Sequence, residues 1–288
     1  MTARRGTRAD RAPAAEDPAR RRLLSLRIDE PAAGADAYPF SVPAVRATRA
    51  LEFTTPVTFF VGENGSGKST LLEGIAAKLR LPTVGSTSVE RDETLAHARR
   101  LAAEMALTWS HAGRAHRGFF LRAEDFFGYT KALAEQQAAL LREMADVERE
   151  YAGRSGMAKA LRLGPVQGSF EETRRRYGDD FDAQSHGEGF LSLFRARFVP
   201  DGLYLLDEPE AALSPTSQIA LLAMLQDMVR DAGQFIIATH SPILLALPGA
   251  TIWSFDERPP RAIAWEESEH VRVTRDFLAA PERYLRHL

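Results

Sequence analysis

The chain has 288 residues, of which 44% are hydrophobic and 26% are charged, and its formal net charge is -2. These values allow one large domain or a core with a subdomain, and they exclude a protein that binds nucleic acid or membranes through its overall charge. The absence of cysteine excludes disulfides, thiol catalysis, cysteine-ligated zinc and iron–sulfur clusters. No apolar run approaches the roughly 18 residues that a membrane-spanning helix needs, so we expect a cytoplasmic protein without membrane insertion.

The sequence pattern of the first part of the chain indicates a tail that is followed by strands and helices. Residues 1–22 are rich in Arg, Ala and Pro, which is typical of a disordered tail. Residues 117–127 predict a strand that leads into a turn. The other expected strands are 23–28, 49–53 and 56–62, and the expected helices are 69–80 and 90–107.

The clearest helical pattern of the chain covers residues 131–151, where side chains repeat at steps of three and four. The apolar stripe lasts only about three heptads, which favours packing inside a subdomain over a long coiled-coil arm. Residues 152–177 contain glycine, proline and six basic side chains against two acidic ones. This composition predicts a loop-rich basic patch, which is either a solvated loop or a surface for nucleic acid.

The second half of the chain alternates helices with buried strands. Residues 190–198 and 217–233 show helical spacing, and the chain ends in a further helical pattern. Strands are expected at 203–210, 234–241, 251–255 and 262–265. Strands that alternate with helices predict an α/β fold with a mostly parallel sheet and helices on its faces.

A phosphate-binding loop is the most specific motif. Residues 62–69 read GENGSGKS and match G-x-x-x-x-G-K-[ST] in full, between an expected strand and an expected helix. The glycines let backbone N–H groups turn toward phosphate oxygens, and the helix N-terminus adds partial positive charge. Lys68 is expected to reach the β- and γ-phosphates, and Ser69 is expected to bind Mg²⁺. The alternative is a glycine-rich turn that contains a lysine by chance, but such a turn has no reason to lie between a strand and a helix. The predicted nucleotide-binding residues of this loop are Gly62, Glu63, Asn64, Gly65, Ser66, Gly67, Lys68, Ser69 and Thr70.

Polar side chains also end two buried strands. Asp207 and Glu208 follow LYLL, and two carboxylates at that position are costly unless a cation or partner uses them. We expect Asp207 to hold Mg²⁺ and Glu208 to act as the general base on the attacking water. His240 ends the strand FIIATH, and its ring is expected to reach the γ-phosphate, although a lone histidine is usually structural.

The string SHGEG at 185–189 lies between the phosphate loop and the acidic strand. With it, the order of motifs resembles the ATP-binding-cassette ATPases over most of the chain from about residue 23 onward. The resemblance implies a P-loop NTPase of ABC type in one domain, 23–288, with a mostly parallel sheet, an antiparallel β subdomain and a helical subdomain at about 83–199. It also implies that ATP and Mg²⁺ are the cofactors and that Lys68, Glu208 and His240 are catalytic.

The same resemblance implies a dimer. Ser185 and Gly187 fill positions of the family signature that caps the ATP of a partner chain, so Mg-ATP would be sandwiched in a head-to-tail homodimer. Glu124 is the best positional substitute for the family's glutamine near the metal. Tyr38 or Phe40 is the candidate for stacking on adenine.

Departures from the family pattern leave several functions open. His186 stands where the signature usually has glycine, and Ser214 stands where an interface aspartate is frequent. These departures resemble the branch that contains SMC-type and DNA-repair ATPases, and especially small stand-alone bacterial AAA-family ATPases. The expected function is ATP hydrolysis coupled to dimerisation. The alternatives are a nucleotide-gated clamp in DNA repair or defence, and the ATP-binding subunit of a transporter that has a membrane partner.

Overall fold

The structure is a computed structural model that describes residues 22–30, 36–84, 95–111, 113–115, 117–153, 155–177 and 186–286. The expected tail lies outside these residues, apart from Arg22.

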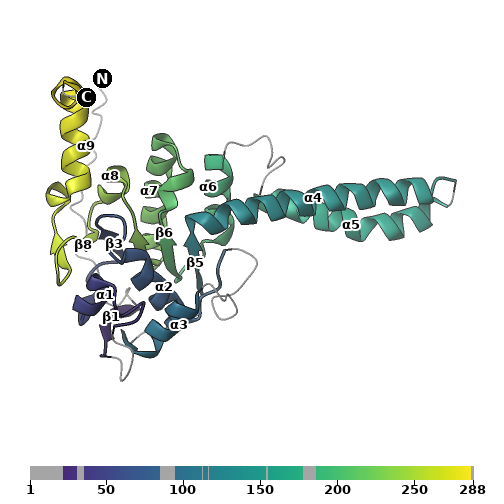
Figure 1. Ribbon diagram of the computed structural model, residues 1–288. Helices are drawn as coiled ribbons and strands as arrows, with labels where there is room; N and C mark the ends of the chain where they lie inside the picture. Colours follow the sequence, from purple (N-terminus) through teal and green to yellow (C-terminus); the bar gives the residue numbers. More distant parts are fainter. Residues whose placement is uncertain are drawn as a thin grey trace, which may run out of the picture.

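The central element is a six-stranded sheet (Figure 1). Its strands, in spatial order, are β5 (Gly118–Arg122), β6 (Leu203–Asp207), β7 (Gln234–Ala238), β3 (Val57–Val61), β8 (Thr251–Ser254) and β9 (Arg261–Ile263). The β8–β9 pair is antiparallel and the other pairs are parallel, so the prediction of a mostly parallel sheet is confirmed. Every residue of β3, β6 and β7 is buried, because helices or a second sheet cover both faces, and this explains why these strands read as continuous apolar runs.

The two faces of the sheet belong to two separate cores. Phe60 and Leu205 point into the first core, while their neighbours Phe59 and Tyr204 point into the second. This alternation follows from the two-residue period of a strand. On the first face lie α2 (Lys68–Leu79), α3 (Ala96–Ala103) and the short α1 (Pro43–Ala47). On the second face lie α6 (His186–Arg197), α7 (Pro215–Arg230) and α8 (Pro242–Leu245).

A three-stranded antiparallel sheet covers α2 and confirms the predicted antiparallel β subdomain. Its strands, in spatial order, are β2 (Ala50–Glu52), β1 (Leu23–Ile28) and β4 (Met105–Trp109). The prediction of a helix through residue 107 was wrong, because pairing of β4 with β1 overrides the local helical spacing after Glu104. The region predicted as a helical subdomain, 83–199, therefore also contributes β4 and β5 to the two sheets.

A helical hairpin projects from the body as an arm (Figure 1). It consists of α4 (Ala123–Glu150) and α5 (Gly156–Tyr177), and the 28 residues of α4 give it a length of about 42 Å. The structure overturns three predictions here. The turn expected after 117–122 is the start of α4, the helix at 131–151 does not pack inside a subdomain, and 152–177 is mostly helix instead of loop.

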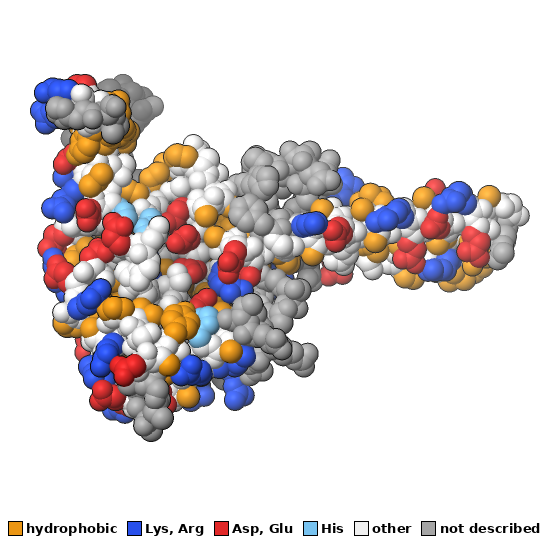
Figure 2. Space-filling model, in the orientation of Figure 1, with side chains coloured by type: hydrophobic (Ala, Val, Ile, Leu, Met, Phe, Trp, Pro, Cys, Tyr) orange, Lys and Arg blue, Asp and Glu red, His pale blue; other side chains and the backbone are white. Residues whose placement is uncertain are grey.

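The packing of α5 against α4 explains why the sequence did not predict the arm. Leu133 and Val147 of α4 are buried, as are Leu163 and Val166 of α5, so the apolar seam is shared between two sequence windows. Basic side chains of α5 form ion pairs with α4: Arg162 lies 3.0 Å from Glu143, and Lys159 lies 3.6 Å from Glu148. Figure 2 shows acidic and basic side chains interspersed along the arm.

The described chain ends in two short helices. After the 3-10 turn Trp265–Glu267, α9 spans Glu269–Ala279 and α10 spans Pro281–Leu285. The expected single C-terminal helix is therefore interrupted before Pro281, as the steric restriction on a residue that precedes proline requires. Within the described ranges, no helix combines the length and the apolar character that crossing a membrane requires.

Candidate nucleotide-binding site

The loop at 62–69 has the conformation that its glycines predict. Gly67 precedes α2 with φ +102°, and a Cβ there would lie 2.8 Å from Val42. Lys68 is 4% exposed, and its Nζ donates hydrogen bonds to the carbonyl oxygens of Gly62 at 2.7 Å and Glu63 at 3.0 Å. Burial lowers the pKa of Lys68, and the nearby carboxylates of Glu208 and Asp207 oppose that shift. The loop therefore holds a buried cation beside the N-terminus of a helix, which is the arrangement that binds a polyphosphate.

Ser69 and Asp207 meet from two different elements. Ser69 Oγ, on the first turn of α2, donates a hydrogen bond to Asp207 Oδ1 at 3.1 Å. Burial raises the pKa of Asp207 to about 7, with further contributions from Glu208 and Glu73, although the Ser69 hydrogen bond lowers it. A carboxylate that is costly to ionise in isolation is one that gains from a bound cation.

The Ser69–Asp207 pair fits Mg²⁺. A hydroxyl and a carboxylate are oxygen ligands, and Mg²⁺ is usually held by one or two such groups together with the phosphates of a substrate. Among the described residues, no cluster of three or more His, Asp or Glu side chains could hold a metal ion unaided.

Glu208 stands at the end of β6 in a left-handed backbone conformation, with φ +49°. This conformation is strained for a residue with a side chain, and such strain is concentrated at functional sites. The backbone N–H of Glu208 donates to the carbonyl oxygen of Ala238 at 2.9 Å, which ties it to β7. Its half-exposed carboxylate lies 3.6 Å from Nε2 of His240, so the predicted base and the predicted phosphate contact do lie together.

Two polar contacts hold His240 in place. Its backbone N–H donates to Glu210 Oε1 at 2.6 Å, and its Nδ1 lies 3.1 Å from Nε2 of His270. Its Nε2 has no hydrogen-bond partner among the described residues. Burial lowers the pKa of His240, and the charges of Lys68 and His270 lower it further, so the ring is neutral near pH 7.

Several site residues were not expected from the sequence. His270 is the second residue of α9, in a segment that carries no motif. Glu73, on α2, adds negative charge near Asp207 and lies 2.6 Å from His97. Asp256 lies two residues after β8 at the same sheet edge and accepts the N–H of Glu63 at 2.7 Å; an acidic residue just after a strand is a signal that could have revealed it.

The remaining predicted residues lie in different settings. Glu124 is exposed at the start of α4, with its carboxylate 3.1 Å from Arg122, so its contact with a metal stays a prediction. Ser185 lies outside the described residues, and Gly187 is in the first turn of α6, so their contact with a partner's nucleotide stays a prediction as well. Ser214 is the N-cap of α7 and accepts the N–H of Ser217 at 3.2 Å.

The two candidates for adenine stacking are clearly separated. Phe40 is 6% exposed and belongs to the first core. Tyr38 is 47% exposed, and its hydroxyl lies 3.3 Å from Oγ1 of Thr70 on the first turn of α2. Of the two, Tyr38 is therefore the one that offers an open ring beside the phosphate loop.

Comparisons with known proteins indicate the family of the chain. A protein-family model described as "AAA domain, putative AbiEii toxin, Type IV TA system" matches residues 98–246, and a second one described as "AAA domain" matches residues 43–87. The lipoprotein-releasing system ATP-binding protein LolD of Hahella chejuensis is 27% identical over 213 residues, which are 72% of this chain and 82% of that protein. The cytochrome c biogenesis ATP-binding export protein CcmA of Cupriavidus pinatubonensis is 30% identical over 183 residues, which are 62% of this chain and 69% of that protein.

One further relative is much longer than this chain. The ribose import ATP-binding protein RbsA 2 of Rhizobium etli is 28% identical over 205 residues, which are 68% of this chain but 36% of that protein. Among solved structures, a nucleotide-free ATP-binding cassette from an ABC transporter has a TM-score of 0.43 at 17% identity, over 85% of this chain and 90% of that chain. Since one AAA-domain family model covers more than half of the chain and ATP-binding proteins align along it, the chain belongs to the AAA-domain P-loop ATPases of ABC type.

Proposed function

We propose that this protein binds Mg-ATP at residues 62–69 and hydrolyses it with a water molecule that Glu208 activates. The observation that carries the proposal is the meeting of Lys68, Ser69, Asp207, Glu208 and His240 at the carboxyl edge of one sheet. Ligands of open α/β sheets bind at this edge.

Each side chain has a distinct task in this reaction. Lys68 and the loop N–H groups bind the β- and γ-phosphates and stabilise the negative charge that grows on them. Mg²⁺, held by Ser69 and Asp207, would neutralise further charge on the phosphates. Glu208 accepts a proton from the attacking water, and its partial exposure leaves it open to that water. The neutral His240 ring directs Nε2 toward the space beside Glu208, where this atom can form a hydrogen bond with the γ-phosphate.

The chain acts as a head-to-tail homodimer in this proposal. Ser185 and Gly187 of one copy would cap the ATP bound by the other, and the start of α6 at His186 supports this, because the N-terminus of a helix attracts anions. Closure of the dimer would move the two projecting arms relative to each other, which is how the ATPase would perform mechanical work.

The names of the relatives favour a second candidate function. LolD and CcmA are described as ATP-binding proteins of release and export systems, so this chain could serve a membrane partner in the same way. Co-purification with a membrane protein that stimulates the ATPase would support that candidate. A homodimer that is fully active without membranes would count against it.

The proposed hydrolysis is tested with Glu208→Gln and Lys68→Ala. Glu208→Gln should still bind Mg-ATP while phosphate release falls by about 10²–10⁴-fold, because the water loses its base. Lys68→Ala should lose ATP binding itself, which calorimetry measures. Turnover of Glu208→Gln within a few-fold of wild type would remove Glu208 from the mechanism.

A further inference from the structure

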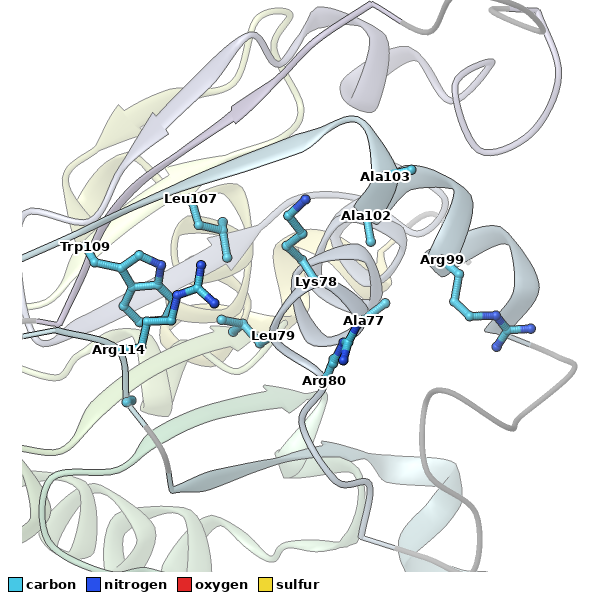
Figure 3. Close-up of a pocket in the computed structure, with 11 residues that line it drawn as sticks. Ala77, Lys78, Leu79, Arg80, Arg99, Ala102, Ala103, Leu107, Trp109 and Arg114 are labelled. Atoms are coloured by element: carbon cyan, nitrogen blue, oxygen red, sulfur yellow. The ribbon is translucent and has the colours of Figure 1, made fainter.

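A second pocket lies at the opposite end of α2 from the phosphate loop (Figure 3). The last turn of α2, helix α3, strand β4 and the segment after β4 form it, and its volume is about 670 Å³. Pockets that bind small ligands have volumes of roughly 300–1,000 Å³. Lys68 begins α2 and the pocket is lined from Ala77 onward, so about 14 Å of helix separate the two.

The lining of the pocket carries one sign of charge. The described residues that line it include Lys78, Arg80, Arg99 and Arg114 and no acidic side chain. Lys78 and Arg80 also compensate the partial negative charge at the end of α2, but Arg99 belongs to α3 and Arg114 follows β4. Cations from three separate segments therefore line one pocket, in a chain whose net charge is -2, and they give the pocket a positive potential that favours an anion.

The same pocket offers a flat aromatic surface. The indole of Trp109 is half-buried. The guanidinium carbon of Arg114 lies over this ring, 5.9 Å from the ring centroid. In Figure 3, Trp109 and Arg114 lie together at one end, Arg99 lies at the other end, and Lys78 and Leu79 lie between them. An acidic peptide would need only the cations, whereas a nucleobase stacks on an aromatic or arginine plane while its phosphate binds the cations.

We propose that this pocket binds a phosphorylated nucleoside unit, either as a free nucleotide or within a single nucleic acid strand. The base stacks on the Trp109–Arg114 pair, and the phosphate lies against the cations at the end of α2. This site goes beyond the proposed ATPase and does not require hydrolysis. It also replaces the patch predicted at 152–177, where Arg162 and Lys159 already form ion pairs with α4.

The probes are a fluorescent oligothymidine of about 12 nucleotides and thymidine monophosphate, both in a Lys68→Ala background without ATP. This background disables the phosphate loop, so failure of the ATPase proposal leaves the test intact. Oligonucleotide affinity should fall as salt rises from about 50 to about 200 mM, because bound phosphates release counterions. Lys78→Glu/Arg114→Glu should weaken binding at least about tenfold, and Trp109→Ala should weaken it about tenfold through lost stacking.

Lys131→Glu/Arg142→Glu is the matched control, because it makes the same charge change at exposed positions on the arm and should leave binding within about twofold. Thermal unfolding verifies each variant, and Lys78→Gln/Arg114→Gln replaces the charge reversal if that variant does not fold. Binding of the oligonucleotide alone identifies a strand as the ligand, and binding of the monophosphate identifies a free nucleotide.

Three results would overturn the proposal. The first is that neither probe binds at low salt. The second is that the pocket variant and the arm variant lose affinity equally, which would reveal a diffuse charge effect. The third is that polyglutamate displaces the oligonucleotide as well as unlabelled oligothymidine does while Trp109→Ala has no effect, which would identify a site for acidic peptides.

Discussion

The rings of His240 and His270 contact each other across two elements that are 30 residues apart in the sequence. Nδ1 of His240 lies 3.1 Å from Nε2 of His270, and the two ring planes are inclined by 86°. This contact joins the end of β7 to the first turn of α9. It also sets which way the ring faces, so that the other nitrogen of His240 points toward Glu208 at 3.6 Å.

Replacing His270 should therefore impair hydrolysis through His240. We expect His270→Ala to lower kcat about tenfold with little change in KM, because the ring of His240 loses its orientation. The acidic limb of the pH profile should move to higher pH, because His270 is one of the groups that lower the pKa of His240. His270→Gln, which keeps a polar group there, should recover much of the rate. An unchanged pH profile would show that His270 only packs α9 against the end of β7.

Asp207 should make stability depend on pH when no nucleotide or metal is present. Its folded pKa of about 7 lies above the unfolded value of 3.8, so its contribution is fully present below about 3.8 and is lost as pH rises through about 7. Asp207→Asn should remove this loss, making the variant more stable than wild type by up to about 4 kcal/mol above pH 7. Urea denaturation of both proteins between pH 5 and pH 8, in the presence of a chelator, measures this difference in stability. If the free energy of unfolding varied with pH in the same way for the two proteins, Asp207 would not be a buried carboxyl with a raised pKa.

Nucleotide should control dimerisation. In sedimentation, Glu208→Gln should be mainly monomeric with ADP and dimeric with Mg-ATP, because only the γ-phosphate bridges the two copies. Adding Ser185→Arg should abolish the dimer without weakening ATP binding at 62–69. Ser155→Arg, at an exposed position in the arm hairpin, is the matched control and should dimerise normally.

Mixing two inactive proteins tests action between chains. A mixed dimer of Ser185→Arg and Lys68→Ala retains one intact composite site, so partial ATPase activity should return on mixing. Normal dimerisation and hydrolysis by Ser185→Arg alone would mean that SHGEG is only the start of a helix.

The arm should depend on its buried seam. Leu163 is 8% exposed and Leu161 is 72% exposed, although they lie two residues apart on α5. Leu163→Asp should therefore melt α5, lowering helical circular dichroism and exposing the basic residues of 155–177 to trypsin, because a buried carboxylate is left without a partner. Leu161→Asp should change neither signal. Equal protease resistance of both variants would contradict the packed hairpin.

The sequence alone determined the parts whose chemistry is local. Residues 62–69 need glycines, a lysine and a hydroxyl in one short stretch, so their role is legible without any partner. The strands that contain Phe59, Leu205 and Ile236 are continuous apolar runs because both faces of the sheet are covered, so the parallel sheet and its order of motifs were also predictable. Asp207 and Glu208 were recognised because two carboxylates directly after such a strand are costly to bury unless a cation or a partner uses them.

Only the tertiary structure decided what depends on distant partners. The helix α5 contains Pro165 and several glycines, and its stability comes from a seam and ion pairs with α4 that no single window displays. His270 has no motif, and it joins the site only because α9 packs beside the end of β7. The basic pocket arises in the same way, since Lys78, Arg99 and Arg114 come to line one pocket when α2, α3 and β4 pack together. Contacts between residues that are remote in the chain are set by packing. The sequence pattern of one segment does not show which faces of the helices and sheets will pack against each other.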